Sequence, residues 1–331
     1  MSKPQRVDVI LCGVGRMGRN HLRVLKESPH FALRAVVDPT LAGTDVSGVR
    51  CYGSVDEVPD ADYTAAVIAT PTESHHAVAL ALLNKSKNLL VEKPLAVTVD
   101  ECNDIRDLAA KKGCKVAVAH VERFNPVVRK VLDIIKSDFI GTPIHFSFTR
   151  VGGWPESVKD GSNVLIDLAV HDLDILQMLV GPVKIVASVA HDTMKKRVFD
   201  TAEILLRSEG GASASIHANW ITPTKIRTLR VTGSKGVLVA DLILQTATVH
   251  GGNLLRRGPE PRITDFAALA EDYRNSDLVE FNVRKEEPLR GQLEAFFHFL
   301  QGESTAISVI PEATRAVQLA QEALSRGRSE G

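Results

Sequence analysis

The first third of the chain alternates short apolar runs with segments of helical periodicity. The apolar runs predict buried strands, and the segments between them predict helices. Thr98-Val99-Asp100-Glu101 has the form of a capping box, and Gly113 is a typical helix stop. Strands that alternate with helices predict a parallel sheet with helices on both faces. The predicted strands cover 7–11, 33–37, 65–69, 89–91 and 115–119, helices follow Gly18 and cover 74–84 and 98–112, and 40–53 reads as a loop.

After His120 the pattern changes to strand-like segments that follow one another without helices between them. Such a run predicts an antiparallel sheet. We expect an exposed face of this sheet to bind a ligand or to pair with another subunit. The predicted strands cover 143–150, 183–189, 202–206, 212–218, 226–231, 237–242 and 246–250; helices cover 125–136, 164–179 and 289–300, and a last one opens at Pro311, while 251–285 has no clear pattern.

A length of 331 residues allows two domains of ordinary size. We expect residues 1–122 to form a Rossmann α/β domain with a doubly wound parallel sheet that binds the dinucleotide. We expect residues 123–331 to form an α+β domain with a large, mainly antiparallel sheet, used for substrate binding and assembly.

A glycine motif stands between the first predicted strand and the first predicted helix. Gly13-Val14-Gly15-Arg16-Met17-Gly18 has the spacing G-x-G-x-x-G in the strand–turn–helix context where the motif has physical meaning. The first glycine permits the tight turn, the second lets backbone approach a pyrophosphate, and the third lets helix and strand pack closely. The unpaired N–H groups at Arg16 and Met17 then face the phosphates.

Asp38 follows the second predicted strand, twenty residues beyond Gly18. A carboxylate at this place accepts hydrogen bonds from a ribose 2′-hydroxyl. The segment Asp38-Pro39-Thr40 has no adjacent arginine to hold a 2′-phosphate, and Asp38 would repel one. The sequence therefore predicts NAD rather than NADP as the cofactor.

Composition excludes several other classes of protein. Forty basic and forty acidic residues balance, which argues against a nucleic-acid or polyanion partner. The four cysteines have no C-x-x-C or metal-ligand spacing, and Cys12 fits a core position. The sequence starts without an apolar signal segment and has no apolar run of roughly 18 residues. We expect a cytoplasmic protein that does not enter a membrane.

Two short motifs at predicted strand ends should face the dinucleotide, because ligands bind at the carboxyl ends of parallel strands. These motifs are Thr70-Pro71 and Glu92-Lys93-Pro94. A partly desolvated Lys93 near the nicotinamide would have a lowered pKa and could assist proton removal from an alcohol. The alternative is a solvated lysine in a turn. His75 and His76 begin the following helix, where one could contact the nicotinamide side or both could be exposed.

Asp167 and His171 are four residues apart in an otherwise apolar helical pattern, so their side chains should share one helix face. Burying two polar groups without partners is costly. The functional interpretation makes His171 a general base, with Asp167 bonded to it or to a substrate hydroxyl. The structural alternative is a core histidine with an acidic neighbour. A zinc site would need a third ligand that the pattern does not supply, so we expect no metal.

Four further residues are candidates for substrate binding. Arg123 and Asn125 lie at the junction itself, although Asn125 also fits an N-cap position before Pro126. Arg150 and Trp154 belong to a loop with two glycines, where a guanidinium and an aromatic face suit a phosphate and a flat base or sugar. A surface loop with one buried tryptophan is the alternative.

These motifs together resemble the Gfo/Idh/MocA family of oxidoreductases over essentially the whole chain. Glu92-Lys93-Pro94 and Asp167-x-x-x-His171 carry the resemblance more specifically than the glycine motif or Thr70-Pro71 with His75 do. In the family, the matching lysine, aspartate and histidine surround the reacting carbon of a sugar or cyclitol. The resemblance implies a two-domain fold whose antiparallel sheet is used to assemble a dimer or tetramer.

Within the family, residues 120–126 and 166–174 resemble the branch that acts on UDP-N-acetylglucosamine. Members of that branch oxidise the 3-hydroxyl of the sugar to a ketone. A PLP-dependent aminotransferase then makes the 3-amino sugar used for lipid A. The resemblance leads to the hypothesis that C3 faces the nicotinamide and that His171 or Lys93 takes the hydroxyl proton.

Three alternatives stay open at this point. A relative that oxidises the uronic acid form, UDP-GlcNAcA, would need a cation for the sugar carboxylate, for which Arg123, Arg150 and Lys159 are candidates. Another sugar or cyclitol of the family could be the substrate. A non-catalytic NAD-binding sensor is the third alternative, against which the presence of Lys93 and His171 argues.

Overall fold

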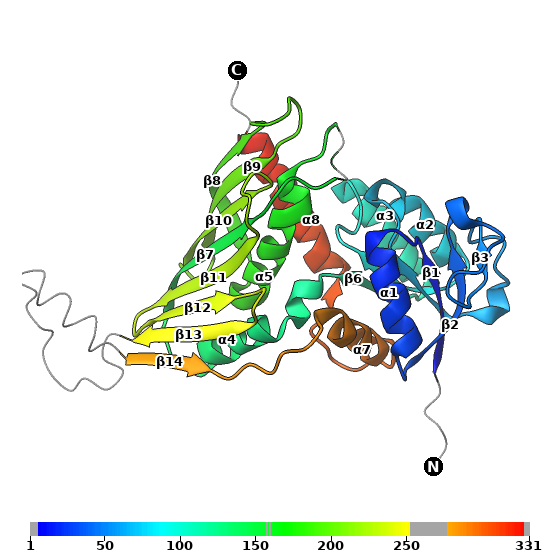
Figure 1. The fold of residues 1–331 in the computed structure, drawn as a ribbon, viewed down its shortest axis with the longest axis horizontal. Coiled ribbons are helices and arrows are strands. Elements are labelled where there is room, and N and C mark those ends of the chain that lie inside the picture. The colour runs from blue at the N-terminus through cyan, green and yellow to red at the C-terminus, as the bar shows by residue number, and fades with distance from the viewer. Residues whose placement is uncertain (1–5, 157, 159, 252–276, 328–331) are drawn as a thin grey trace, which may run out of the picture. The chain divides into compact units, whose positions relative to one another are not determined.

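The computed structural model describes residues 6–156, 158, 160–251 and 277–327. The chain forms two compact units (Figure 1), of which the first is Met1–Phe124 with Glu286–Gln318 and the second is Asn125–Lys285 with Leu319–Gly331. The first boundary lies two residues beyond the expected one. The assignment of all of 123–331 to one domain is wrong for residues 286–318, because this segment packs on the first sheet.

The first unit is built on a seven-stranded sheet in the order β15-β6-β5-β4-β1-β2-β3. All neighbouring pairs are parallel except β15 with β6. The strand order reverses between β1 and β4, which is the doubly wound Rossmann arrangement that was predicted. The strands are β1 (Val7–Cys12), β2 (Phe31–Val37), β3 (Cys51–Tyr52), β4 (Ala65–Ile68), β5 (Asn88–Glu92), β6 (Val116–Ala119) and β15 (Ser308–Val309).

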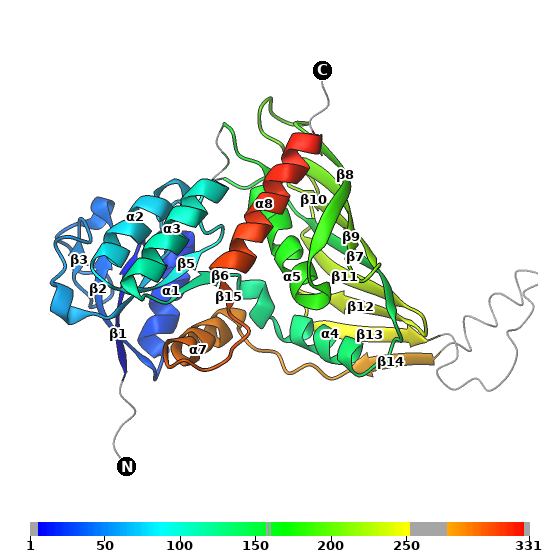
Figure 2. The same cartoon turned by 180° about the vertical axis from the view of Figure 1, so that it is seen from behind.

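Helices cover both faces of this sheet because its strands are apolar on both sides. One core holds side chains of α2 and α3, which lie next to each other (Figure 2), together with the start of α8. The other core holds side chains of α1 and α7. Cys12 lies in the first core as expected, and burial raises the pKa of its thiol to about 12. The helices are α1 (Arg16–Glu27), α2 (Thr72–Asn84), α3 (Val99–Lys112), α7 (Pro288–Leu300) and α8 (Ile310–Gly327).

Two local predictions in the first unit have different outcomes. The capping box at Thr98 is confirmed, because its hydroxyl accepts the Glu101 N–H and the Glu101 carboxylate accepts the Thr98 N–H. The predicted helix end is also confirmed, since Gly113 follows α3 with a left-handed φ of 66°. The predicted loop 40–53 is wrong at its end, where β3 pairs with β2 and extends the sheet.

The second unit is built on an eight-stranded sheet in the order β14-β13-β12-β11-β7-β10-β9-β8. Only β7 and β10 pair in parallel, so the prediction of a mainly antiparallel sheet is confirmed. The strands are β7 (Pro143–Val151), β8 (Val183–His191), β9 (Thr201–Ser208), β10 (Ser213–Asn219), β11 (Ile226–Gly233), β12 (Val237–Asp241), β13 (Thr246–Gly251) and β14 (Asp277–Phe281).

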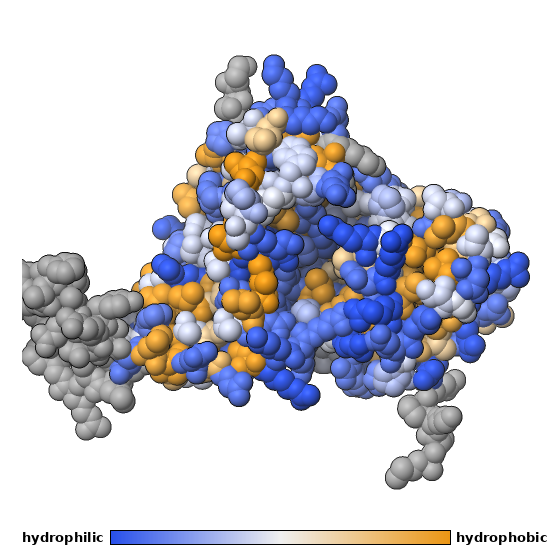
Figure 3. All heavy atoms as spheres, in the orientation of Figure 1, coloured by the Kyte–Doolittle hydropathy of each residue, from blue (hydrophilic) through white to orange (hydrophobic). Residues whose placement is uncertain are grey.

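One face of the second sheet is covered and the other is open. Side chains of α4 (Pro126–Lys136), α5 (Val170–Val180) and the last turns of α8 form a core with the alternate residues of the strands. Leu205 and Leu278 on the strands are 50% and 62% exposed. Apolar side chains gather over the end of the unit that holds β12 to β14 (Figure 3). The described helices include none that is long and apolar enough to cross a membrane.

The predicted helix 164–179 is not α-helical throughout. Its first turn, Leu165–Ala169, is a π-helix, and α5 begins only at Val170. The Asn163 side chain accepts the Ile166 N–H at 2.9 Å before this turn. The wider turn keeps Leu165 and Ala169 fully buried while the residues between them are half-buried. π-Helical turns are rare and occur often at functional sites.

A buried ion pair joins β7 to α5. The Arg150 guanidinium donates to both carboxylate oxygens of Asp172 at 2.8–3.0 Å, and the two residues are 1% and 2% exposed. The planar guanidinium matches the carboxylate geometry in a way that lysine cannot. This pair fixes the helix that follows the π turn to the sheet.

Removing one partner of this pair should destabilise the protein strongly, because the other charge stays buried and uncompensated. We expect Asp172→Asn and Arg150→Met each to lower the free energy of unfolding by about 3–5 kcal/mol in chemical denaturation. Asp160→Asn is the control, since Asp160 pairs with Lys195 in an exposed position. Equal unfolding midpoints for all three variants would show that the buried pair does not stabilise the fold.

The glycine turn allows a second test of the fold. A Cβ on Gly18 would lie 2.1 Å from the Gly13 carbonyl oxygen, whereas a Cβ on Gly15 would have nothing within 4 Å. Gly18→Ala should therefore lower stability by about 3 kcal/mol through overpacking. Gly15→Ala should keep the unfolding midpoint and weaken dinucleotide binding, because it fills the space that the pyrophosphate approaches. Thermal unfolding with and without NAD separates the two effects.

Candidate active site

The turn after β1 and the end of β2 form the expected dinucleotide site. Asp38 Oδ2 accepts the Val14 N–H at 3.0 Å, and Asp38 Oδ1 accepts the N–H and hydroxyl of Thr40 at 3.0 and 2.6 Å. Gly15 is exposed, and it is followed by the first two residues of α1, Arg16 and Met17. The open space at Gly15 and the carboxylate of Asp38 are the features that a bound NAD requires.

The electrostatics of Asp38 favour its charged form. Partial burial opposes ionisation, but the hydrogen bonds from the Thr40 hydroxyl, the Val14 N–H and the Thr40 N–H outweigh it. The pKa of the Asp38 carboxyl therefore lies below its usual value. At neutral pH this group is an anion that accepts hydrogen bonds and repels phosphate.

The predicted strand-end motifs lie along one edge of the first sheet. β1, β4 and β5 are parallel neighbours, with Cys12 paired to Ile68 and Ile68 to Val91. Gly13, Thr70 and Lys93 follow these strands at the same end. Lys93 is half-buried, Thr70 is half-buried and Pro71 is exposed. The fold therefore brings together the glycine turn and the two motifs that the sequence placed near the dinucleotide.

The histidines at the start of α2 differ from each other. His76 is half-buried, and its Nε2 lies 3.1 Å from Asp104. His75 is 1% exposed, so the idea that both are exposed is wrong. Its Nδ1 lies 2.9 Å from the Pro94 carbonyl oxygen, and its Nε2 lies 3.0 Å from that of Thr70. A direct contact of His75 with the cofactor stays a prediction.

Glu92 has a buried partner that sequence analysis missed. Its Oε1 lies 2.7 Å from Nε2 of His21, and both residues are less than 10% exposed. Glu92 Oε2 also accepts the Lys93 N–H at 3.2 Å. His21 lies on the buried side of α1 with Leu22 and Leu25. A polar residue on the apolar side of a helix requires a buried partner, and this was the sequence signal for the contact.

Asp167 and His171 stand in the second unit on either side of the change from π-helix to α-helix. Asp167 lies in the π turn, and His171 is the second residue of α5. Both are half-buried. In an α-helix a spacing of four residues would place both side chains on one face, but the wider π turn changes the angle between the two side chains around the helix axis. Their roles as base and partner stay predictions.

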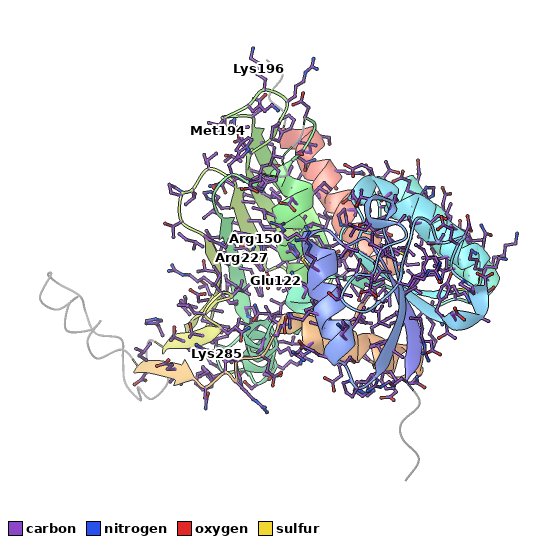
Figure 4. All side chains as sticks on the ribbon, turned by 45° about the vertical axis from the view of Figure 1, so that its right-hand side comes forward. Glu122, Arg150, Met194, Lys196, Arg227 and Lys285 are labelled. Carbon is purple, nitrogen blue, oxygen red and sulfur yellow. The ribbon has the colours of Figure 1, made fainter. Side chains whose placement is uncertain are left out.

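Arg150 and Trp154 occupy different surroundings in the second unit. Arg150 is buried and pairs with Asp172, so its guanidinium has a structural role, and a substrate contact stays a prediction. Trp154 is 40% exposed and forms an edge-to-face pair with the buried Trp220, with 6.2 Å between ring centroids. Arg227 on β11 is paired with Arg150 on β7 and lies beside it (Figure 4). Side chains alternate along a strand, so Arg227 shares one face of β11 with Leu229, and this pattern was a sequence signal for its place.

Arg123 and Asn125 are both buried and bonded within their own units. Arg123 pairs with Glu312 at 2.8 Å. Asn125 caps α4 by accepting the Val127 N–H, and its amide donates to the Leu242 carbonyl at 2.8 Å. The capping interpretation of Asn125 is thus correct, and substrate contacts of both residues stay predictions. Lys159, the third cation considered, lies outside the described residues.

The described part of the chain contains no group of three or more histidine, cysteine, aspartate or glutamate residues placed to hold a metal ion. Its four cysteines carry no disulfide.

Comparison with known proteins agrees with this geometry. Residues 7–120 match the model of the oxidoreductase family with an NAD-binding Rossmann fold, GFO_IDH_MocA. Residues 128–239 match the model of the GFO/IDH/MocA C-terminal domain. The two matches follow each other in the order that the family has and together cover more than half of the chain.

Relatives of the chain include enzymes with different substrates. The chain is 28% identical to scyllo-inositol 2-dehydrogenase (NAD(+)) of Bacillus subtilis over 337 residues, which cover 85% of this chain and 98% of the relative. It is 26% identical to UDP-N-acetylglucosamine 3-dehydrogenase of Acidithiobacillus ferrooxidans over 245 residues, 72% of this chain and 75% of the relative.

The fold is also found among solved structures. The structure of the UDP-N-acetylglucosamine 3-dehydrogenase GnnA from Acidithiobacillus ferrooxidans aligns with a TM-score of 0.80 over 96% of this chain and 97% of that one, at 19% identity. At this identity the likeness concerns the fold. The two family models show that the chain belongs to the Gfo/Idh/MocA family of NAD-binding oxidoreductases.

Proposed function

We propose that this protein oxidises the 3-hydroxyl of UDP-N-acetylglucosamine to a 3-keto sugar with NAD. The family makes the chain an NAD-dependent oxidoreductase of a sugar or polyol CH–OH group. The observation that carries the proposal is the place of Lys93, which follows β5 at the same sheet edge as the glycine turn. Among groups on this edge, a half-buried ammonium is suited to act on a substrate hydroxyl.

Two features support a nucleotide sugar as the substrate. One is the likeness of residues 120–126 and 166–174 to the branch acting on UDP-N-acetylglucosamine, to which the relative from Acidithiobacillus ferrooxidans belongs by name. The other is Trp154, whose exposed ring rests edge to face on Trp220 and offers a flat apolar surface for a base or sugar.

The first unit would hold the cofactor through a few groups. The N–H groups of Arg16 and Met17 would bind the pyrophosphate at the N-terminus of α1, and Asp38 would accept the ribose hydroxyls. When bound, NAD⁺ supplies the hydride acceptor. Glu92 at the end of β5 and Thr70 after β4 lie at the edge of the sheet where the nicotinamide would bind.

Residues of the protein accept the proton of the sugar hydroxyl. Lys93 or His171 takes this proton as general base, and which of them does so stays open. Where His171 is the base, a positioned ammonium at Lys93 stabilises negative charge that develops on the oxygen, which is worth about 3 kcal/mol when water is excluded. Asp167 orients His171 or binds a neighbouring hydroxyl.

Other substrates remain as outcomes to test. The longer match to scyllo-inositol 2-dehydrogenase favours a cyclitol as the second candidate. UDP-GlcNAcA would require a cation for its carboxylate, and a non-catalytic NAD sensor would turn over none of these compounds. The proposed reaction would feed a PLP-dependent 3-aminotransferase, as in the route to the diamino sugar of lipid A, and would take place in the cytoplasm.

We further propose that the open sheet face assembles two or four copies of the chain. Leu205 and Leu278 expose large apolar surface on ordered strands of this face, which a monomer would leave in water. Neither nucleic acid nor membrane is proposed as a partner, since the charges balance.

Asp38 should set the preference for NAD over NADP. Because the pKa of Asp38 is lowered, its charge should persist as the pH falls from 9 to 7, and the ratio of the two dissociation constants should stay constant over that range. Any stability that the carboxylate adds is lost only when the pH falls through this lowered pKa. Asp38→Asn should reduce the ratio by about tenfold, measured by fluorescence titration. Unchanged discrimination in Asp38→Asn would contradict this role.

The reaction is tested by incubating the protein with NAD⁺ and a panel of UDP-sugars and cyclitols, with a PLP aminotransferase present to draw off the ketone. We expect mass spectrometry to show loss of two hydrogens from UDP-N-acetylglucosamine when the aminotransferase is left out, and replacement of the 3-hydroxyl by an amino group when it is present. Lys93→Ala should lower kcat about 10²- to 10⁴-fold and leave NAD binding intact. The exposed Lys111→Ala is the matched control.

Three results would redirect the proposal. Turnover of inositol alone would keep the family and discard the branch. No turnover of any compound by NAD-loaded protein would favour the sensor. Near-normal turnover in both Lys93→Ala and His171→Asn would contradict the assigned catalytic residues.

A further inference from the structure

Two buried histidines hold the segment that carries Lys93. His21 on α1 is 0% exposed, and its Nε2 lies 2.7 Å from the Glu92 carboxylate. The other oxygen of that carboxylate accepts the Lys93 N–H. The residue before Lys93 is therefore tied to the helix that begins at the glycine turn.

The second histidine acts on the residue after Lys93. His75 on α2 has Nδ1 at 2.9 Å from the Pro94 carbonyl and Nε2 at 3.0 Å from the Thr70 carbonyl. Carbonyl oxygens only accept hydrogen bonds, and a neutral imidazole has a single N–H. The tautomer therefore decides which of the two carbonyls accepts the ring N–H, and the ring lies between the loop after β4 and the loop after β5.

We propose that His21 and His75 are positioning residues of the reaction, which set the place of the Lys93 ammonium without contacting the substrate. The inference rests on the proposed function, in which Lys93 is catalytic. His21 acts through the side chain of Glu92, and His75 acts through the carbonyl of Pro94. Together they connect the turns after β1, β4 and β5, the three strands whose ends form the dinucleotide site.

The effect on rate follows from the geometry of catalysis. A catalytic group displaced by about 1 Å can lose about 10²-fold in rate although its chemistry is intact. The bonds of the two histidines are buried, so water cannot replace them at low cost. A histidine that only fills the core would instead affect stability and cofactor binding together with the rate.

Paired substitutions separate the two ring nitrogens. The amide nitrogen of asparagine takes about the place of Nδ1, and that of glutamine takes about the place of Nε2. His75→Asn therefore keeps the bond to Pro94, and His75→Gln keeps only the bond to Thr70. For His21 the order is reversed, because Nε2 is the atom that meets Glu92, so His21→Gln keeps the contact and His21→Asn loses it.

The expected result is a crossed pattern in the full-length, NAD-loaded protein. We expect kcat within about threefold of wild type for His75→Asn and His21→Gln, and a fall of about 10- to 100-fold for His75→Gln and His21→Asn. The KM for NAD and the melting temperature should be similar within each pair. Amide exchange at Lys93, followed by mass spectrometry, should be faster in the two variants that lose their contact.

Other outcomes would overturn the inference. Equal kcat and equal Lys93 exchange within each pair would show that the contacts do not position Lys93. Unfolding or loss of NAD binding in all four variants would show that the histidines are purely structural. If the wild-type protein turns over no sugar or cyclitol, the proposed function fails, and the exchange rates still decide whether the two histidines hold the segment.

Discussion

The parallel pairing of β1, β4 and β5 is the constraint on which the candidate site depends. It brings three chain turns to one edge of the first sheet, so that the glycine turn, Thr70 and Lys93 lie together although they are far apart in sequence. The start of α1 packs closely on the first of these turns, since a Cβ on Gly18 would overlap the Gly13 carbonyl. The pyrophosphate site and Lys93 therefore lie at the same end of the sheet.

Much of this fold could be predicted from the sequence because its signals are local. The capping box at Thr98, the stop at Gly113 and the apolar strands need only a few neighbouring residues to be recognised. The return of residues 286–318 to the first unit could not be predicted in this way. It depends on the antiparallel pairing of β15 with β6 and on the packing of Phe296 against Phe31, which are contacts distant in sequence.

In the candidate site, too, the sequence identified residues with local motifs but did not show the contacts between distant segments. Sequence motifs identified Glu92, Lys93 and His75. They could not show that Glu92 meets His21, because these two side chains are 71 positions apart in the sequence. They could not show that His75 lies between two carbonyls, because backbone acceptors leave no trace in a sequence. The pairing of Arg150 with Asp172 was missed because it joins a strand to a helix that is distant in sequence. The π turn at Asp167 likewise depends on packing rather than on residue type.

In the proposed reaction this chain removes hydride from C3 of UDP-N-acetylglucosamine. The most direct test uses the substrate labelled with deuterium at C3, with NAD⁺ and the coupled aminotransferase. We expect reduced cofactor that carries one deuterium and a sugar product that has lost it. Reduced cofactor without deuterium, or deuterium retained in the sugar product, would contradict oxidation at C3.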